Sequence, residues 1–470
     1  MSELDYRNKD IGNKTSAQRQ QSEDIGKESS NLAEINGKVN KRAVIVTNST
    51  NFEPRAELVG RCLEEEGIEV TYIYSDFSHR EKKKLDRKQP NHIYLPTLPY
   101  QKNLSLARIR SQMDFAEKMR KKLAGMEYDL LYVLLPANSL AKAAAEDIAR
   151  KKGKADRTDR PRLVFDIIDL WPESLGTGRL KALQGTPPFL YWKNLRDKYL
   201  PAADLAVTEC DLYREMLQLD PEKSMTLYWV KQGSADTKET NTEPESESEE
   251  QTEGKSYEQK TYAASDTEIK REAPGCKNTI RLAYLGAINN IIDIDGIVRV
   301  CKELQGEESG YKVQMEIIGD GEGRERFLTA LKDAGIDYTY HGAVFNEVRK
   351  KEILQSCDFG LNLMKPGVCV GLTMKSIDYW SYGLPILNNI PGDTWRLVED
   401  EGMGVNTDWN ETWREAVQQK LSNSHEGLKK QRGKEPFDTE IFRNYENLFS
   451  EKSVGSRIKR YLLPLVAEAG

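Results

Sequence analysis

An alternation of strand and helix patterns runs through most of this chain and is interrupted once by a long polar segment. The first run begins with KRAVIVTNS and includes the apolar stretches YDLLYVLLP and RLVFDIID, with helical patterns between them. The second run begins with TIRLAYLG and continues through VQMEIIGDG and CDFGLNLM. Continuous apolar runs of this kind are typical of strands that are buried on both faces. The pattern therefore predicts parallel sheets wrapped by helices, an α/β fold class.

The polar interruption divides the predicted fold into two halves, and 470 residues are too many for one core. We expect two Rossmann-like domains that face a common cleft, at residues 41–232 and 276–450. Residues 1–40 are expected to form a disordered arm and residues 233–275 an acidic linker, because both lack the large apolar side chains that offset ordering entropy. Residues 451–470 are expected to form a C-terminal helix.

Composition excludes several kinds of partner and site. The net charge of −6 gives no reason to expect nucleic acid as a partner. The cysteines and histidines are scattered without paired spacing, so neither a zinc cluster, a disulfide framework nor a hydrolase triad is indicated. The first residues are polar, and no run of about 18 apolar residues occurs, so we expect a cytoplasmic protein that does not span a membrane.

Residues 370–389, VGLTMKSIDYWSYGLPILNN, combine helix-capping signals with charged side chains. Thr373 suits the N-cap, and the later Gly-Leu-Pro ends the helix. The free N–H groups that follow Gly371 are expected to meet an anion, most commonly phosphate. Lys375 would lie beside that phosphate, and Asp378 would accept hydrogen bonds from ribose hydroxyls. An ordinary surface pair of Lys375 and Asp378 is the alternative.

Glycines follow two strands of the second run. Gly319 and Gly321 lie between strand and helix in EIIGDGEGRERF, and Gly286 ends the strand of LGAINN. Glycine lets a backbone approach a ligand closely, so these turns are candidate ligand contacts. Plain turns that need only a flexible residue explain them equally well.

Asp169 ends the strand of LVFDIID and is expected to orient an acceptor hydroxyl as a base, with a turn or capping role as the alternative. The acids of DID at residues 293–295 start a helix, so no metal site is expected there. The segment PPFLYWKNLRDKYL mixes aromatic and basic side chains. It would either contact anionic lipid head groups or pack on its own domain.

The order of these motifs resembles that of glycosyltransferase family 4, whose enzymes have the two-domain GT-B fold. The segments IIGDGEGRERFL, HGAVFNEVRKKEILQSCDFGLNL and GLTMKSIDYWSYGLPIL resemble the C-terminal half of these enzymes. NFEPRAELVGRCLEEEGIEVTYI and FDIIDLWPESL resemble the N-terminal half. The resemblance covers most of residues 41–405 and points to polysaccharide or capsule-type enzymes of bacteria.

This resemblance implies roles for residues of both halves. The second half would bind a nucleotide-sugar, with His341 and Val344 under the base, the turn before Lys375 at the diphosphate, and Asp378 at the ribose. The implied donor-binding residues are Gly286, Gly319, Gly321, His341, Val344, Gly371, Leu372, Thr373 and Asp378. The implied catalytic residues are Lys375, Asp169 and Arg55. The C-terminal helix would cross back to the first domain.

Two departures from the family pattern affect the expected function. Val370 and Asp378 stand where the family commonly has two glutamates, and LGAINNIID lacks the usual Arg and Lys. We expect a retaining, metal-independent enzyme that needs no cofactor and moves a sugar from a UDP-linked donor to a saccharide or lipid-linked saccharide hydroxyl, with peripheral contact at the inner face of the membrane. The alternative is a non-catalytic sugar-nucleotide-binding partner of a polysaccharide-assembly complex.

Overall fold

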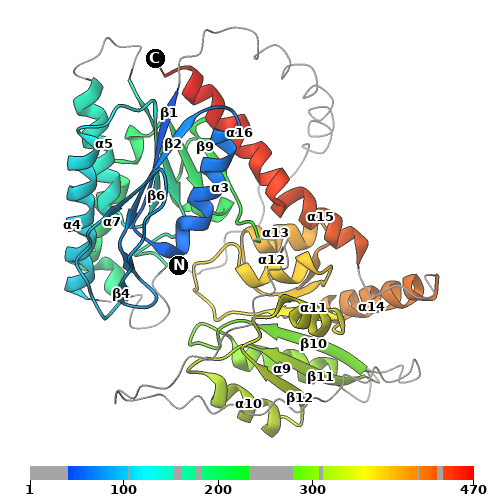
Figure 1. Cartoon of the computed structure of the whole chain (residues 1–470). Helices are drawn as coiled ribbons and strands as arrows, with labels where there is room; N and C mark the ends of the chain where they lie inside the picture. The colour runs from blue at the N-terminus through cyan, green and yellow to red at the C-terminus, as the bar shows by residue number, and fades with distance from the viewer. Residues whose placement is uncertain are drawn as a thin grey trace, which may run out of the picture. The chain divides into compact units, whose positions relative to one another are not determined.

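The computed structural model of the chain contains two parallel β-sheets with helices packed against both faces (Figure 1). The structure describes residues 41–103, 105–152, 160–174, 182–231, 279–305, 311–407, 409, 412–430 and 438–469, without the side chains of 423–430. The predicted arm at 1–40 and the predicted acidic linker at 233–275 lie outside these residues.

The first sheet has seven parallel strands in the order β5-β2-β1-β6-β7-β8-β9. These strands are β1 (Arg42–Thr47), β2 (Glu69–Ser75), β5 (His92–Leu95), β6 (Leu130–Leu135), β7 (Arg162–Ile167), β8 (Leu205–Thr208) and β9 (Ser224–Thr226). Two short antiparallel strands, β3 (Phe77–Ser78) and β4 (Lys83–Lys84), lie beside it. The order in which strands are added to the sheet reverses between β1 and β6. Ligands bind at this switch point in such sheets.

Helices cover both faces of this sheet (Figure 1). Apolar side chains of its strands alternate between the two faces and pack against the helix layer on each side. One face packs against α4 (Leu106–Leu123), α5 (Ser139–Lys152) and α7 (Pro187–Asp197). The other face packs against α3 (Glu53–Glu64) and α16 (Glu451–Ala467). All six residues of β6 are buried, as the apolar run LLYVLL predicts for a central strand. A short helix, α8 (Asp211–Met216), follows β8.

The second sheet has six parallel strands in the order β12-β11-β10-β13-β14-β15. These strands are β10 (Thr279–Leu285), β11 (Lys312–Ile318), β12 (Asp337–Gly342), β13 (Phe359–Asn362), β14 (Ile386–Asn388) and β15 (Gly404–Asn406). This is the strand order of a dinucleotide-binding Rossmann sheet, with its switch point between β10 and β13. Its helices are α9 (Ile294–Leu304), α10 (Arg324–Asp333), α11 (Glu347–Gln355), α12 (Met374–Ser381), α13 (Asp393–Asp400), α14 (Thr412–Lys430) and α15 (Thr439–Phe449).

The last helix, α16, packs its apolar face on α3 and the first sheet. Val454, Ile458, Leu462 and Val466 recur every four residues and are all buried there. The polar flank of α16 is fixed by Lys459, whose Nζ lies 2.8 Å from Glu65 and 2.7 Å from Glu66. The predicted C-terminal helix therefore exists and contacts the first sheet.

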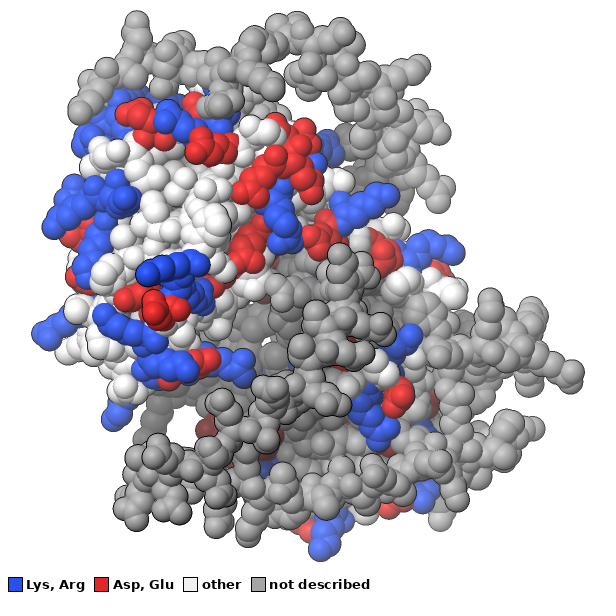
Figure 2. All heavy atoms as spheres, in the orientation of Figure 1, with Lys and Arg blue, Asp and Glu red and all other residues white. Residues whose placement is uncertain are grey.

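The fold class predicted from the sequence is confirmed: both halves are parallel sheets of Rossmann-like strand order. The exact domain boundaries stay a prediction. Within the described residues, every helix is too short or too polar to cross a lipid bilayer. On the face drawn in Figure 2, the Lys and Arg side chains of the described residues lie among Asp and Glu side chains.

Candidate functional site

Helix α12 begins at the carboxyl end of β13, beside the switch point of the second sheet. Thr373 is its N-cap, and its Oγ1 accepts a hydrogen bond of 3.2 Å from the Ser376 N–H. The same hydroxyl donates to Asn362 Oδ1 at 3.0 Å, and Asn362 Nδ2 donates to Ser376 Oγ at 2.9 Å. Asn362 ends β13 and thereby fixes the first turn of the helix. The helix predicted from Thr373 and Gly383, the latter at φ 64°, is confirmed.

Tyr379 fixes the body of α12 against β10 and β13. Its hydroxyl accepts from the Leu285 N–H at 2.7 Å and donates to the Ala283 carbonyl at 3.2 Å. A Cβ at Gly360 of β13 would lie 2.5 Å from the Tyr379 ring, so glycine is needed at that strand position. The first turn of α12 is thus held rigidly where a parallel sheet presents its ligand-binding edge.

Lys375 lies in this first turn, and its ammonium is buried. Its Nζ has no hydrogen-bond partner among the described residues and lies 5.1 Å from the centre of the Tyr284 ring. Burial lowers the pKa of Lys375 to about 8. A buried ammonium without a counter-charge is costly, and an anion bound there would remove that cost. The geometry therefore suits the anion site predicted at this turn.

Asp378 lies one turn after Lys375 and is paired with Lys231 at 3.4 Å. Lys231 also lies 3.4 Å from Glu347 and donates to Ser381 Oγ at 3.1 Å. Burial raises the pKa of Asp378, and the charge of Lys231 opposes this rise. The alternative of a Lys375–Asp378 surface pair is not favoured, because Lys375 Nζ has no hydrogen-bond partner among the described residues and Asp378 pairs with Lys231. Nothing in the sequence around Lys231 or Glu347 signals this cluster.

The turn before α12 is closely packed. The Gly371 carbonyl accepts hydrogen bonds from the Thr394 N–H at 2.8 Å and from Thr394 Oγ1 at 2.7 Å. A Cβ at Gly371 would lie within 3 Å of Asp393, Cys210 and Leu212, and Leu372 is buried in the core. Glycine is therefore required at 371 by packing, whether or not a ligand binds.

Asp393 makes polar contacts that no sequence pattern predicts. Its carboxylate accepts hydrogen bonds from the N–H groups of Asp211 at 2.7 Å and Leu212 at 2.9 Å, and from the Tyr228 hydroxyl at 3.0 Å. A carboxylate at the first N–H groups of a helix stabilises it, so Asp393 at the start of α13 also caps α8.

Gly286, Gly319 and Gly321 bring two loops of the second sheet together. All three have positive φ angles, of 116°, 143° and 155°. A Cβ at Gly319 would lie 1.9 Å from the Gly286 carbonyl oxygen, and a Cβ at Gly321 would lie 2.4 Å from the Ile288 carbonyl oxygen. The close approach that these glycines allow is between the two loops themselves, which favours the structural explanation; a ligand role stays a prediction.

His341 lies at the end of β12, and Val344 follows this strand at the same edge. His341 Nε2 lies 2.7 Å from Glu316 Oε2 on the neighbouring strand β11. Val344 is half-buried against the core, and the adjacent Phe345 is 83% exposed. The ring of His341 is thus oriented by a carboxylate, and its predicted place under a nucleotide base stays a prediction.

Arg55 is buried inside the first half, with 3% of its surface exposed. Its guanidinium donates to both carboxylate oxygens of Asp166, at 2.7 and 2.9 Å, and to the Leu227 carbonyl at 2.7 Å. The Tyr132 hydroxyl also donates to Asp166, at 2.7 Å. This is a fully paired internal network, which gives Arg55 a structural function and lends no support to its predicted catalytic role.

Asp169 and Glu209 lie just after β7 and β8, at the carboxyl edge of the first sheet. Burial raises the pKa of Asp169, and a hydrogen bond from Ser174 and the charge of Arg108 oppose the rise. Burial raises the pKa of Glu209 to about 8. Both carboxyls are thus candidates for proton transfer. Glu209 was missed in the sequence, although an acid directly after a buried strand is the signal that pointed to Asp169.

The acids of the DID motif serve helix α9. Asp293 is its N-cap and accepts from the Gly296 N–H at 3.0 Å, while Asp295 pairs with Arg326 at 2.9 Å. Within the described ranges, no group of three His, Cys, Asp or Glu side chains is placed to hold a metal ion.

Comparison with solved structures defines the fold. The chain is similar to sucrose-phosphate synthase from Thermosynechococcus elongatus, with a TM-score of 0.56 and 11% identity over 91% of this chain and 99% of that one. It is similar to a trehalose-6-phosphate protein from E. coli bound with UDP-2-fluoro glucose, with a TM-score of 0.54 and 8% identity over 91% and 99%. The chain is also similar to HepE from Anabaena in complex with UDP and glucose, with a TM-score of 0.50 and 11% identity over 90% of this chain and 100% of that one.

These likenesses extend over nearly the whole length of each compared chain. With the two parallel sheets, they show that this chain has the GT-B fold. No protein-family model matches the sequence, and no curated protein matches it. At identities of 8 to 11%, the likeness establishes the fold and not the activity.

Proposed function

We propose that the protein is a glycosyltransferase. It moves a sugar from a UDP-linked donor to a hydroxyl of a saccharide or lipid-linked saccharide, with retention of configuration and without a metal ion. The observation that carries this proposal is the buried ammonium of Lys375 in the first turn of α12, which has no hydrogen-bond partner among the described residues. Two of the compared GT-B structures were solved with UDP or a UDP-sugar, which supports the choice of donor.

The chemistry required of the donor site is stabilisation of a leaving diphosphate. Lys375 supplies one positive charge, and the free N–H groups at the start of α12 supply aligned dipoles. Because the ammonium is already desolvated, its interaction with the developing charge is stronger than in water. Asp378 would hold the ribose after exchanging part of its contact with Lys231. His341, oriented by Glu316, would lie under the base.

The acceptor half would contribute a carboxylate at the edge of the first sheet. Asp169 and Glu209 follow neighbouring strands, and both have raised pKa values because they are buried. A carboxyl of this kind can accept a proton from an attacking hydroxyl. We propose that the protein works in the cytoplasm, at the inner face of a membrane when its acceptor is lipid-linked.

The second candidate function is that of a sugar-nucleotide-binding partner without turnover. It is favoured by Val370, which stands where the family pattern has an acid, and by the dense packing of Gly371 against Asp393 and Leu212. Such a protein would bind UDP through the same ammonium and leave the sugar in place.

Thermal unfolding with a panel of nucleotide diphosphates and their sugars tests the shared claim of donor binding. UDP and at least one UDP-sugar are expected to raise the melting temperature, because a ligand that binds only the folded protein stabilises it by mass action. If no nucleotide diphosphate shifts the transition, both candidate functions fail.

Donor consumption separates the two candidates. Incubation of the intact protein with the stabilising UDP-sugar and a set of saccharide and lipid-linked acceptors should release UDP, and Lys375→Ala should abolish the release while Lys332→Ala, an exposed lysine of α10, should not. Binding without release of UDP by the unaltered protein would favour the partner function.

A further inference from the structure

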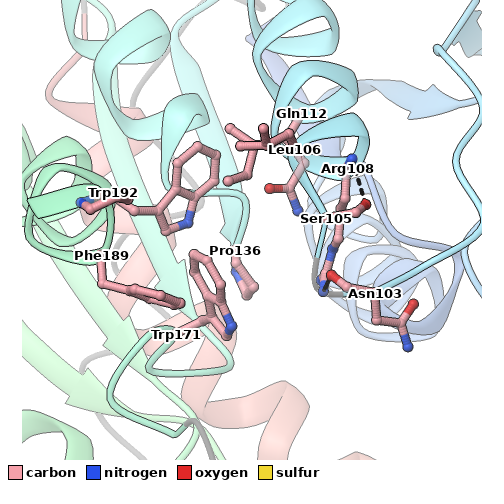
Figure 3. A pocket seen from close by; sticks show the side chains of 11 residues that line it. Asn103, Ser105, Leu106, Arg108, Gln112, Pro136, Trp171, Phe189 and Trp192 are labelled. Carbon is pink, nitrogen blue, oxygen red and sulfur yellow. Dashed lines mark hydrogen bonds between the residues drawn. The ribbon is translucent and has the colours of Figure 1, made fainter. Parts of the chain in front are cut away.

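A pocket lies inside the first half, between the start of α4 and helix α7 (Figure 3). Its volume is about 250 Å³. An apolar cavity of about 150 Å³ holds a benzene ring, so this pocket has room for roughly ten carbon atoms. Trp171, which follows Asp169 by two residues, forms part of its wall. The pocket is therefore next to the candidate acceptor carboxylate.

One wall of the pocket is aromatic and apolar. Trp171 packs edge-on against Trp192, with ring centres 5.6 Å apart. It also contacts Phe189 at a tilted angle, with ring centres 5.7 Å apart. Pro136 continues this wall (Figure 3). Trp192 is 1% exposed, and its Nε1 has no hydrogen-bond partner among the described residues. A buried indole N–H of this kind is usually satisfied by a water or ligand oxygen.

The opposite wall, at the start of α4, is formed by the apolar Leu106 and Ile109 together with Asn103, Ser105, Gln112 and the charged Arg108. Arg108 Nη1 donates to the Asn103 carbonyl at 3.0 Å, and Lys82 Nζ donates to Asn103 Oδ1, so two cations converge on one residue of the wall. No carboxylate lies within ion-pair distance of either cation in the described part of the chain. Arg108 Nε is buried and has no hydrogen-bond partner in the part of the chain that the structure describes. Converging cations that form no ion pair with the described residues suit a bound anion.

The pKa values of two neighbouring groups are lowered by burial and by the positive charge at this wall. Burial and the charge of Arg108 lower the pKa of Lys82. Burial, with the charges of Arg108 and Lys82, lowers the pKa of His79 to about 4. His79 therefore stays neutral at pH 7 and adds no charge of its own. An anion at Arg108 and Lys82 would relieve the repulsion between them.

Large apolar side chains are exposed around the pocket. Exposed large apolar residues of the two flanking segments, 98–113 and 183–191, are Leu98, Leu106, Met113, Leu183, Leu190 and Tyr191. Leu106, in the pocket wall itself, is 73% exposed. A cluster of exposed apolar side chains beside a pocket marks a binding site more often than single scattered apolar side chains do. An entering chain would cover part of this surface.

We propose that this pocket binds a lipid with an anionic head group: its apolar chain lies against Trp171, Phe189 and Trp192, and its phosphate meets Arg108 and Lys82. The inference rests on the proposed function, because it assigns the acceptor to the class of lipid-linked phosphates. Asp169 then lies on the head-group side, where the saccharide of such an acceptor begins. The phosphate of such a lipid would accept a hydrogen bond from the buried Nε of Arg108, which has no partner among the described residues.

Geranyl phosphate, with ten carbons, is the probe that matches the pocket. Titration followed by tryptophan fluorescence should show saturable binding, because two tryptophans line the site. Isopentenyl phosphate carries the same head group on five carbons and should bind at least 30-fold more weakly, since each buried carbon contributes about fourfold in affinity. Geraniol, which lacks the phosphate, should bind at least tenfold more weakly than geranyl phosphate.

Two kinds of variant distinguish the site of the hydrocarbon chain from the site of the phosphate. Ile109→Trp fills the pocket with an apolar side chain and should abolish binding of both geranyl compounds. Arg108→Ala and Lys82→Ala should weaken geranyl phosphate at least tenfold and leave geraniol within twofold. Lys83→Ala removes the next lysine, which is paired with Glu81 at 2.8 Å, and should change nothing.

Several outcomes would overturn the inference. Equal binding of isopentenyl and geranyl phosphate would show an anion site only, and unchanged binding by Ile109→Trp would place the lipid elsewhere. Absence of geranyl phosphate binding, while UDP still raises the melting temperature, would refute the lipid site and leave the proposed glycosyl transfer standing. Binding of geranyl phosphate without any effect of nucleotides on the melting temperature would support the lipid site and refute the proposed glycosyl transfer.

Discussion

Lys375 is the residue on which the functional argument depends. Its ammonium is buried over the Tyr284 ring without a hydrogen-bond partner in the described residues, and the ring supplies only a weak attraction compared with a carboxylate. The protein in its ligand-free state therefore carries an uncompensated charge. Such a cost is expected at a binding site and has no evident structural benefit.

Replacement of this side chain by an apolar one of similar length should stabilise the ligand-free protein. Lys375→Met is predicted to raise the free energy of unfolding by about 2 kcal/mol at pH 7, because it removes a buried charge that has no partner. The folded-state pKa of about 8 lies below the ordinary value of 10.5. The penalty is thus complete below pH 8 and is lost as the pH rises toward 10.5, so the gain from methionine should shrink over that range. Denaturant unfolding at pH 7 and pH 9.5 checks this, and a loss of stability at pH 7 would contradict it.

Nucleotide binding should depend on the same proton. The phosphates of UDP are fully ionised above pH 7.5, whereas Lys375 loses its charge as the pH passes about 8. The affinity for UDP is therefore predicted to fall roughly tenfold between pH 7.5 and 9.5 in the unaltered protein. Lys375→Met should bind weakly at both values, with no such fall. Calorimetric titration measures both, and a pH-independent affinity of the unaltered protein would exclude Lys375 from the phosphate contact.

Arg55 has a structural function according to its contacts, so its replacement should lower stability. Arg55→Met would leave Asp166 buried with only the Tyr132 hydroxyl as a side-chain partner. The variant is predicted to lose about 3 to 5 kcal/mol of unfolding free energy, the usual effect of breaking a buried ion pair. Chemical denaturation checks the loss. A variant as stable as the unaltered protein, but without donor turnover, would restore the catalytic role predicted from the sequence.

At the scale of elements, the period of the apolar residues was sufficient to predict strands and helices. The continuous run LLYVLL became the fully buried β6, and Thr373 with Gly383 set both ends of α12. These features depend on residues close in sequence. The pairing of Lys231 with Asp378 joins residues 147 positions apart, and the convergence of Lys82 and Arg108 on Asn103 depends on how a loop folds against α4. No local pattern encodes such contacts, so the sequence predicts the elements that carry the candidate residues but not the partners of these residues.

The glycine loops of the second sheet give a prediction at this scale. Gly319→Ala would place a Cβ 1.9 Å from the Gly286 carbonyl oxygen and is predicted to destabilise the protein by about 3 kcal/mol. Gly335→Ala is the matched control, because Gly335 also has a positive φ, of 68°, but no atom lies within 4 Å of its added Cβ. It should cost about 1 kcal/mol. Thermal unfolding of both variants checks the difference, and equal losses would show that backbone conformation alone, and not loop contact, requires the glycine.

At the scale of the whole molecule, two sheets of similar strand order place their candidate residues at the same kind of edge. Lys375 lies at the carboxyl end of β13, and Asp169 and Glu209 lie after β7 and β8. Ligands of doubly wound sheets bind at such edges because strand ends and helix N-termini meet there. The GT-B fold explains why a single chain carries two of these edges, and α16 continues from the helices of the second sheet onto the first.

The central claim is that the start of α12 binds the diphosphate of a UDP-linked donor through Lys375. Calorimetric titration of UDP at pH 7 into the unaltered protein, Lys375→Met and the surface control Lys332→Met measures it directly. We expect saturable one-to-one binding by the unaltered protein and the control, and at least 30-fold weaker binding by Lys375→Met. Equal affinity of all three proteins, or no binding by the unaltered protein, would contradict it.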